Sequence, residues 1–157
     1  MKFSLNQKDL QQSLSYCQSV IEKRSTLPIL SNVLLDASNS KLKITATDLD
    51  LIFINEIKNV EIAEEGKTTT TSSIMYDIIR KFSPGKKINF NLTDENKIHL
   101  ESEKSVFNLN CITATEFPLT DENFSGNEFI IKSKQLLKLL NKCKFSVSND
   151  ETRHYLS

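Results

Sequence analysis

Acidic side chains offer the first possible chemistry in this sequence of 157 residues. Asp48 and Asp50 are separated by one leucine, and two carboxylates at that spacing can hold a divalent cation. The pair also lies between two apolar runs, where aspartate more often caps a turn. A metal site at these two residues is therefore the less favoured of the two interpretations, and no metal ligand is predicted.

The remaining polar candidates lack the partners that catalysis needs. His99 alternates with Ile98 and Leu100, which places its imidazole on the solvent side of a strand. His154 has no serine or cysteine nucleophile at a diagnostic spacing. The three cysteines are odd in number, far apart and without CxxC spacing, which predicts neither disulfides nor a zinc site and favours a reducing cytoplasm. No catalytic residue and no cofactor is predicted.

Glycine and charge content exclude further classes of protein. Only three glycines occur, and none begins a GxGxxG or GxxxxGK[ST] pattern, which excludes the usual nucleotide-binding loops. No apolar run approaches the roughly 20 residues that span a bilayer, so no membrane partner is expected. Twenty basic residues balance twenty acidic ones, and binding to a polyanion would therefore depend on uneven placement of charge.

One lysine stripe is placed in a way that suits phosphate contact. Lys134, Lys138 and Lys142 recur at i, i+4 and i+8 on a predicted helix, opposite an apolar face that includes Leu136 and Leu140. Elsewhere too, basic and amide side chains favour the predicted helices, whereas acids collect in strands and loops. Spaced lysines make weak, sequence-neutral contacts with duplex phosphates, although such a stripe is more often only a solvated face.

Two similar series of elements would position these residues. The first is predicted as a strand, a helix and three strands, at residues 2–5, 10–21, 33–35, 41–46 and 51–57, with Asn6 as the helix cap and Leu10 and Leu14 on the apolar face of the helix. The second repeats that order at residues 68–71, 75–82, 88–92, 98–100 and 107–111, with Ser72 or Ser73 as the helix cap and Met75 and Ile79 on the apolar face of the helix. The predicted fold class is therefore α+β, with two strand-helix-strands repeats in one domain.

A polar stretch divides the sequence near its C-terminal end. Residues 116–127 include Pro118 and Gly126 and are the predicted linker. We expect one domain at residues 1–125 and the beginning of a second at 126–157, with a strand at 129–131 and a helix capped by Ser133. About 30 residues cannot form an independent core of this type, so the second domain is expected to be truncated.

Four segments, in order, carry a family resemblance. They are RSTLPILSNVLL at residues 24–35, TATDLD at 45–50, EFP at 116–118 and RHYL at 153–156. They resemble segments of the bacterial DNA polymerase III beta subunit, the replicative sliding clamp. The resemblance implies helices on an inner face, antiparallel sheets outside, and three such domains per subunit. It also implies that two subunits form a head-to-tail homodimeric ring around duplex DNA. Such a ring would act in the cytoplasm as a non-catalytic processivity factor of the replicative polymerase.

The same resemblance implies DNA-contacting residues. Arg24 would touch DNA at the inner rim, and His154 and Tyr155 align with an aromatic pair near the DNA path, with His154 in place of the commoner tyrosine. Ser73 and Asp150 occupy positions where relatives can carry basic or amide side chains.

Two protein interfaces are implied as well. Arg153 and Leu156 would form one edge of the pocket that binds short motifs of polymerase and clamp-loader subunits. Phe107 and Leu109 would supply one half of the ring interface.

Two alternatives from other classes remain open at this point. One is a metal-dependent enzyme that uses Asp48 and Asp50, and the other is a protein-interaction domain without a nucleic-acid role. The first requires a third ligand and an open pocket, and the second leaves the lysines on the predicted helices unexplained.

Overall fold

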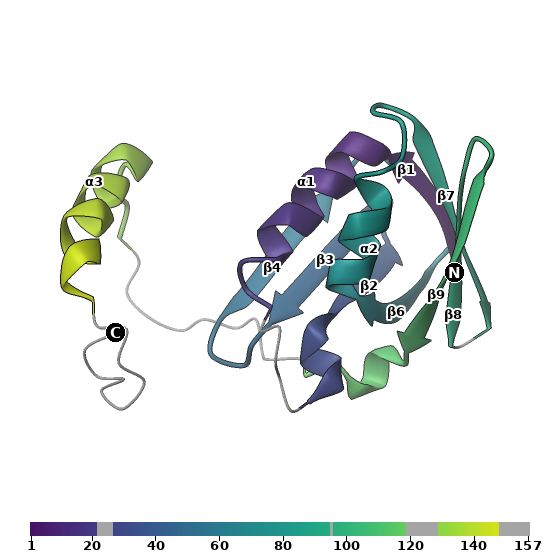
Figure 1. The fold of residues 1–157 in the computed structure, drawn as a ribbon, viewed down its shortest axis with the longest axis horizontal. Helices are drawn as coiled ribbons and strands as arrows, with labels where there is room; N and C mark the ends of the chain where they lie inside the picture. Colours follow the sequence, from purple (N-terminus) through teal and green to yellow (C-terminus); the bar gives the residue numbers. More distant parts are fainter. Residues whose placement is uncertain (22–26, 95, 119–128, 148–157) are drawn as a thin grey trace. The chain divides into compact units, whose positions relative to one another are not determined.

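A computed structural model describes residues 1–21, 27–94, 96–118 and 129–147 of the chain (Figure 1). The chain divides into two compact units, Met1–Leu119 and Thr120–Ser157, and each is considered by itself. No helix within the described ranges is long and apolar enough to span a membrane.

The first unit is built from antiparallel strands and two α-helices, which confirms the predicted α+β class. Its elements in chain order are β1 (Lys2–Asn6), α1 (Gln7–Cys17), a 3-10 turn (Pro28–Ser31), β2 (Asn32–Ser38), β3 (Lys41–Thr47), β4 (Ile52–Ile57), β5 (Val60–Glu64), β6 (Gly66–Thr71), α2 (Ser72–Ile79), β7 (Lys87–Asp94), β8 (Lys97–Ser102), β9 (Ser105–Ile112) and a second 3-10 turn (Ala114–Glu116).

The strands join in the order β4-β3-β2-β6-β9-β8-β7-β1-β5. The first strand of each repeat pairs with the strand that follows the helix of the other repeat. Thus β1 pairs with β7, with Leu5 opposite Ile88, and β6 pairs with β2, with Thr69 opposite Leu34. The two repeats therefore interlock, and each half of the sheet contains strands from both repeats.

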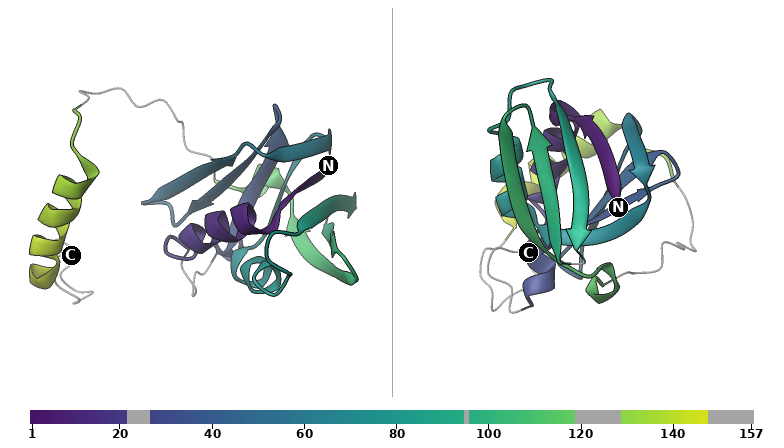
Figure 2. Two further views of the ribbon diagram at one scale, coloured as in Figure 1. Left: turned by 90° about the horizontal axis from the view of Figure 1, so that it is seen from above. Right: turned by 90° about the vertical axis from the view of Figure 1, so that its right-hand side faces the viewer.

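The core lies between the sheet and the two helices. Figure 1 shows α1 and α2 side by side, and Figure 2 shows both on the same side of the strands. The predicted apolar faces are the buried ones: Leu10 and Leu14 of α1 and Met75 and Ile79 of α2 are fully buried. Burying whole apolar side chains in this way supplies the main drive for folding.

The two helices begin differently. The Asn6 side chain accepts a hydrogen bond from the backbone N–H of Lys8 at 2.9 Å, which is the predicted cap of α1. Thr71 is the cap residue of α2 and makes no side-chain capping bond, so the predicted cap at Ser72 or Ser73 is wrong. The Ser72 hydroxyl instead accepts a hydrogen bond from Nε2 of Gln18 at 2.7 Å, which ties the two helices together.

A short seam between β6 and β9 connects the two halves of the sheet at its middle. Only Thr69 and Thr70 of β6 pair with β9, opposite Ile112 and Cys111. Threonine side chains reinforce this seam: Oγ1 of Thr69 donates to the Ile112 carbonyl at 2.8 Å, and Oγ1 of Thr70 donates to the Asn110 carbonyl at 2.9 Å. Hydrogen bonds from buried hydroxyls thus supplement the few backbone hydrogen bonds between β6 and β9.

Two strand predictions differ from the structure. Strand β5 (Val60–Glu64) was not predicted, yet it pairs antiparallel with β1. The strand predicted at 129–131 is not formed, since no strand among the described residues pairs with that segment. Both differences arise because strand formation depends on a distant partner.

In the second unit the described residues form α3 (Ser133–Cys143) and a 3-10 turn (Lys144–Ser146). The helix is confirmed, but Lys132 and not Ser133 is its cap residue, and no side-chain capping bond forms. No residue of α3 is buried, and Leu136 and Leu140 remain exposed, because the described part of this unit contains nothing for the apolar face to pack on.

We expect Thr69→Val to lower the free energy of unfolding of this chain by about 1–3 kcal/mol. The substitution removes the donor to Ile112 and leaves the buried Nδ2 of Asn32, which donates to Thr69 at 3.1 Å, without its partner. Urea unfolding followed by circular dichroism measures the change. Thr68→Val is the matched control, because the equally buried Thr68 hydroxyl lies beside the Cys111 thiol without a nitrogen or oxygen partner among the described residues. Equal losses for both variants would contradict the role of the seam.

We expect alkylation of the native chain to distinguish its cysteines. Burial raises the pKa of the Cys17 thiol to about 12 and also raises the pKa of the Cys111 thiol, whereas Cys143 is exposed. Thiolates are the reactive species, so iodoacetamide at pH 8 should modify Cys143 first, by peptide mass spectrometry. Modification of Cys17 at the same rate as Cys143 would show that α1 does not pack as described.

Candidate functional site

The acidic turn between β3 and β4 is closed by its own side chains. Oδ1 of Asp48 accepts hydrogen bonds from the backbone N–H groups of Asp50 and Leu51, at 3.1 and 2.7 Å. Oγ1 of Thr47 accepts another from the N–H of Leu49 at 2.9 Å. Asp48 therefore caps this turn, and no group of three or more potential metal ligands occurs in the part of the chain that the structure describes.

The exposed side of α1 carries uncharged polar groups. Gln12, Ser15 and Ser19 are exposed, together with Lys8 at the first turn. The serine hydroxyls donate to carbonyls of the preceding turn, with Ser15 bonded to Gln12 at 2.7 Å. Most of these groups are neutral, and the charged side chains of the first turn are Lys8 and the half-buried Asp9, so this surface attracts a polyanion only weakly.

The exposed side of α2 and its end is mixed in charge. Arg80 and Lys81 are exposed directly after the helix, as predicted. Asp77 is also exposed, with its Oδ1 3.7 Å from Nε of Arg80, so the expectation that the acids lie in strands and loops is wrong at this helix. An exposed pair of this kind contributes little to stability, and Arg80 can exchange it for another anion at small cost.

The predicted lysine stripe is present on α3. Lys134, Lys138 and Lys142 are exposed, and none of them forms an ion pair with another residue of the described ranges. The positions i, i+4 and i+8 keep the three ammonium groups along one side of the helix.

Several predicted site residues lie outside the described residues. They are Arg24, Asp150, Arg153, His154, Tyr155 and Leu156. Their proposed contacts with DNA and with partner peptides therefore stay predictions. Ser73, by contrast, lies in the first turn of α2 and is exposed.

Among the described residues, one edge of strand β9 has no strand partner over most of its length. It pairs with β8 from Ser105 to Asn110, but with β6 only at Cys111 and Ile112. Phe107 is 36% exposed at this edge, whereas Leu109 is 7% exposed and packs in the core of its own unit. An unpaired strand edge with an exposed aromatic residue is a surface to which another chain can add a strand.

Three acids of the sheet are paired with lysines. Lys41 and Glu56 form an ion pair at 2.8 Å, Lys67 and Asp36 at 2.9 Å, and Lys87 pairs with Glu61. The hydrogen bond from Lys41 holds the pKa of Glu56 below its usual value. These three pairs are each neutral overall, so they add no net charge to the sheet.

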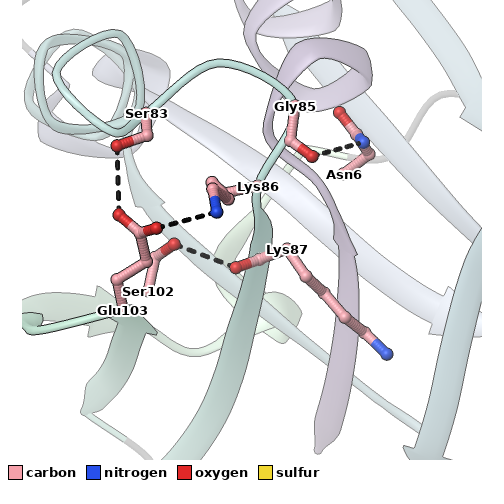
Figure 3. A network of polar contacts seen from close by, with 7 residues as sticks. All are labelled: Asn6, Ser83, Gly85, Lys86, Lys87, Ser102 and Glu103. Atoms are coloured by element: carbon pink, nitrogen blue, oxygen red, sulfur yellow. Dashed lines mark hydrogen bonds and ion pairs between the residues drawn. The ribbon is translucent and has the colours of Figure 1, made fainter.

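Sequence reasoning missed a polar network around Glu103 (Figure 3). Glu103, in the turn between β8 and β9, accepts from Oγ of Ser83 at 3.0 Å and pairs with Nζ of Lys86 at 3.0 Å. The ring of Phe82 meets that of Phe107 edge to face, with centroids 5.6 Å apart. No sequence pattern links these residues, which are about 20 positions apart and meet only through the sheet.

Comparison with known proteins gives consistent matches. Residues 1–121 match the family described as DNA polymerase III beta subunit, N-terminal domain. Over its whole length the chain is 33% identical to the beta sliding clamp of Caulobacter vibrioides and 31% identical to that of Escherichia coli K12. It spans 42% and 43% of the length of these two relatives.

Solved structures agree with the sequence comparison. A Caulobacter crescentus DNA polymerase III beta structure superposes with a TM-score of 0.92 at 33% identity, covering 99% of this chain and 42% of that one. A Bartonella birtlesii sliding clamp bound to griselimycin superposes with a TM-score of 0.93 at 33% identity, covering 99% and 41%. The interlocked repeats and the match over residues 1–121 lead to one conclusion: this chain belongs to the family of the DNA polymerase III beta subunit, the bacterial sliding clamps.

Proposed function

We propose that this chain is the N-terminal part of a processivity factor, a sliding clamp that encircles duplex DNA and tethers the replicative polymerase. The observation that carries the proposal is the match of residues 1–121 to the N-terminal domain of the beta subunit. In this proposal the clamp has no catalytic site or cofactor of its own and works in the cytoplasm. Residues 1–125 form its first domain and 126–157 begin the second.

The DNA-facing surface in this proposal is made of helices. The exposed polar side of α1, Arg80 and Lys81 after α2, and the lysines of α3 suit weak contact with phosphates. Arg24, His154 and Tyr155 would add contacts at the rim. Weak contacts are what sliding requires, because a ring holds DNA by encirclement and strong direct contacts would stall it.

Partner proteins would bind through short peptide motifs. Arg153 and Leu156 are the residues of this chain proposed for the edge of that pocket. The Bartonella birtlesii clamp was solved with griselimycin bound, which supports a ligand site in clamps of this family.

The ring interface would use the open edge of β9. Phe107 offers exposed aromatic area there, whereas Leu109, on the same face of the strand, is buried in the core of its unit. A head-to-tail contact of this kind is heterologous, so a different surface of the second subunit must complete it.

The DNA proposal predicts weak binding by the 157-residue chain. We expect a dissociation constant of about 10⁻⁴ M or weaker for a labelled duplex at physiological salt, rising steeply as salt is added. Replacing Lys134, Lys138 and Lys142 by alanine should remove most of that binding in fluorescence anisotropy, because the stripe supplies phosphate contacts. The matched control replaces three lysines of the sheet, Lys41, Lys67 and Lys97, and should change binding less. Sub-micromolar, sequence-selective binding would contradict the sliding-clamp proposal.

The ring proposal predicts a separable role for Phe107. In the three-domain protein, Phe107→Ala should weaken dimerisation by on the order of a few kcal/mol, because apolar contact area is lost at the interface. Sedimentation equilibrium gives the dimer dissociation constant. Leu51→Ala, which truncates another exposed apolar side chain away from β9, serves as the control. An unchanged dimer in the Phe107 variant would place the ring interface elsewhere.

A further inference from the structure

Side-chain contacts connect the β8–β9 turn to the loop that follows α2, in addition to the backbone pairing of the hairpin itself. The hairpin connects Ser102 and Ser105 through Glu103 and Lys104 alone, a two-residue connection. Glu103 adopts a φ of 53°, a left-handed backbone conformation that residues other than glycine seldom take. Such a conformation persists when the surroundings stabilise it.

Those surroundings come from residues 83–87, as Figure 3 shows. One carboxylate oxygen of Glu103 accepts from Ser83, and the other pairs with Lys86, each at 3.0 Å. The hydrogen bonds from Lys86 and Ser83 hold the pKa of Glu103 below its usual value. Beside them, the buried hydroxyl of Ser102 donates to the carbonyl of Lys87 at 2.9 Å.

The loop is itself fixed from its other side. Nδ2 of Asn6 donates to the Gly85 carbonyl at 3.1 Å, and the N–H of Gln7 donates to the Lys86 carbonyl at 2.8 Å. Within the same loop, the buried Phe82 places its ring edge to face with Phe107. The start of α1, the end of α2 and the tip of the β8–β9 hairpin are therefore connected through one loop.

We propose that Glu103 is a positioning residue for ring closure: by joining the β8–β9 turn to Ser83 and Lys86, it holds Phe107 against Phe82 and keeps the open edge of β9 ready for the second subunit. This inference rests on the proposed ring interface at β9. Without the Glu103 contacts the hairpin tip can bend away from the loop, and Phe107 samples orientations that the partner cannot use. The free energy of dimerisation then includes the entropic cost of reordering the hairpin tip.

The test measures the dimer dissociation constant of the three-domain protein by sedimentation equilibrium. Glu103→Ala should raise this dissociation constant about tenfold, because each of the two interfaces of the ring loses a small part of its binding free energy. Glu61→Ala is the matched control, because it removes the exposed partner of the neighbouring Lys87 without touching the turn. The control should leave the constant unchanged.

Rescue and stability separate positioning from a merely structural role. The exchanged pair Glu103→Lys with Lys86→Glu should restore most of the dimer affinity, and Glu103→Gln should be intermediate because it keeps the acceptor for Ser83. Thermal unfolding of the 157-residue chain should change by only a few degrees in Glu103→Ala, as expected for an exposed pair.

The possible failures are distinguishable. If Phe107→Ala weakens the dimer but Glu103→Ala behaves like Glu61→Ala, the positioning role is overturned and the ring interface stands. If the exchanged pair does not restore affinity, the pairing with Lys86 is not what positions the turn, and the inference is overturned in that form. If Phe107→Ala has no effect, the interface at β9 fails and the inference fails with it.

Discussion

The exchange of first strands between the two repeats is the constraint on which the rest of the structure depends. Strand β1 completes the half that contains β7, and β6 completes the half that contains β2. Because each helix follows its exchanged strand directly, α1 and α2 are brought to the same side of the sheet and lie side by side. The polar helical surface and the open edge of β9 are both consequences of this arrangement. A change that separates the repeats would therefore disturb both candidate interfaces together.

Local patterns were sufficient to predict most of this fold. The spacing of Leu10 and Leu14, and of Met75 and Ile79, predicted which faces of the helices are buried, and Asn6 was identified as a cap. Strand β5 could not be predicted in the same way, because its stability comes from pairing with β1, more than fifty residues earlier. The buried threonines of the seam were equally hidden. A run of threonines predicts a strand, but only the neighbouring β9 explains why their hydroxyls are useful inside the sheet.

The candidate site was predictable in its residue types more than in its geometry. The stripe of Lys134, Lys138 and Lys142 follows from helical periodicity, and the structure confirms the helix and its exposure. Alternation along β9 put Phe107 and Leu109 on one face, but it could not show that Leu109 is covered while Phe107 stands at the edge of the core. The contacts of Glu103 arise from a turn that is near Ser83 only in space. The burial of one residue relative to its neighbour on the same strand face, and long-range polar contacts, depend on the folded sheet, so a short window of sequence does not indicate either.

The pairing of β1 with β7 also has a consequence for synthesis on the ribosome. Phe3 and Leu5 of β1 leave the ribosome first, yet their partners Phe90 and Ile88 are added much later. At about 5–20 residues per second, this strand waits roughly 4–17 s for its longest neighbour. During that interval two large apolar side chains, later buried, have only β5 available for pairing. The nascent chain is thus most prone to aggregation before its second repeat emerges, and slowing translation between α1 and β7 would lengthen that vulnerable period.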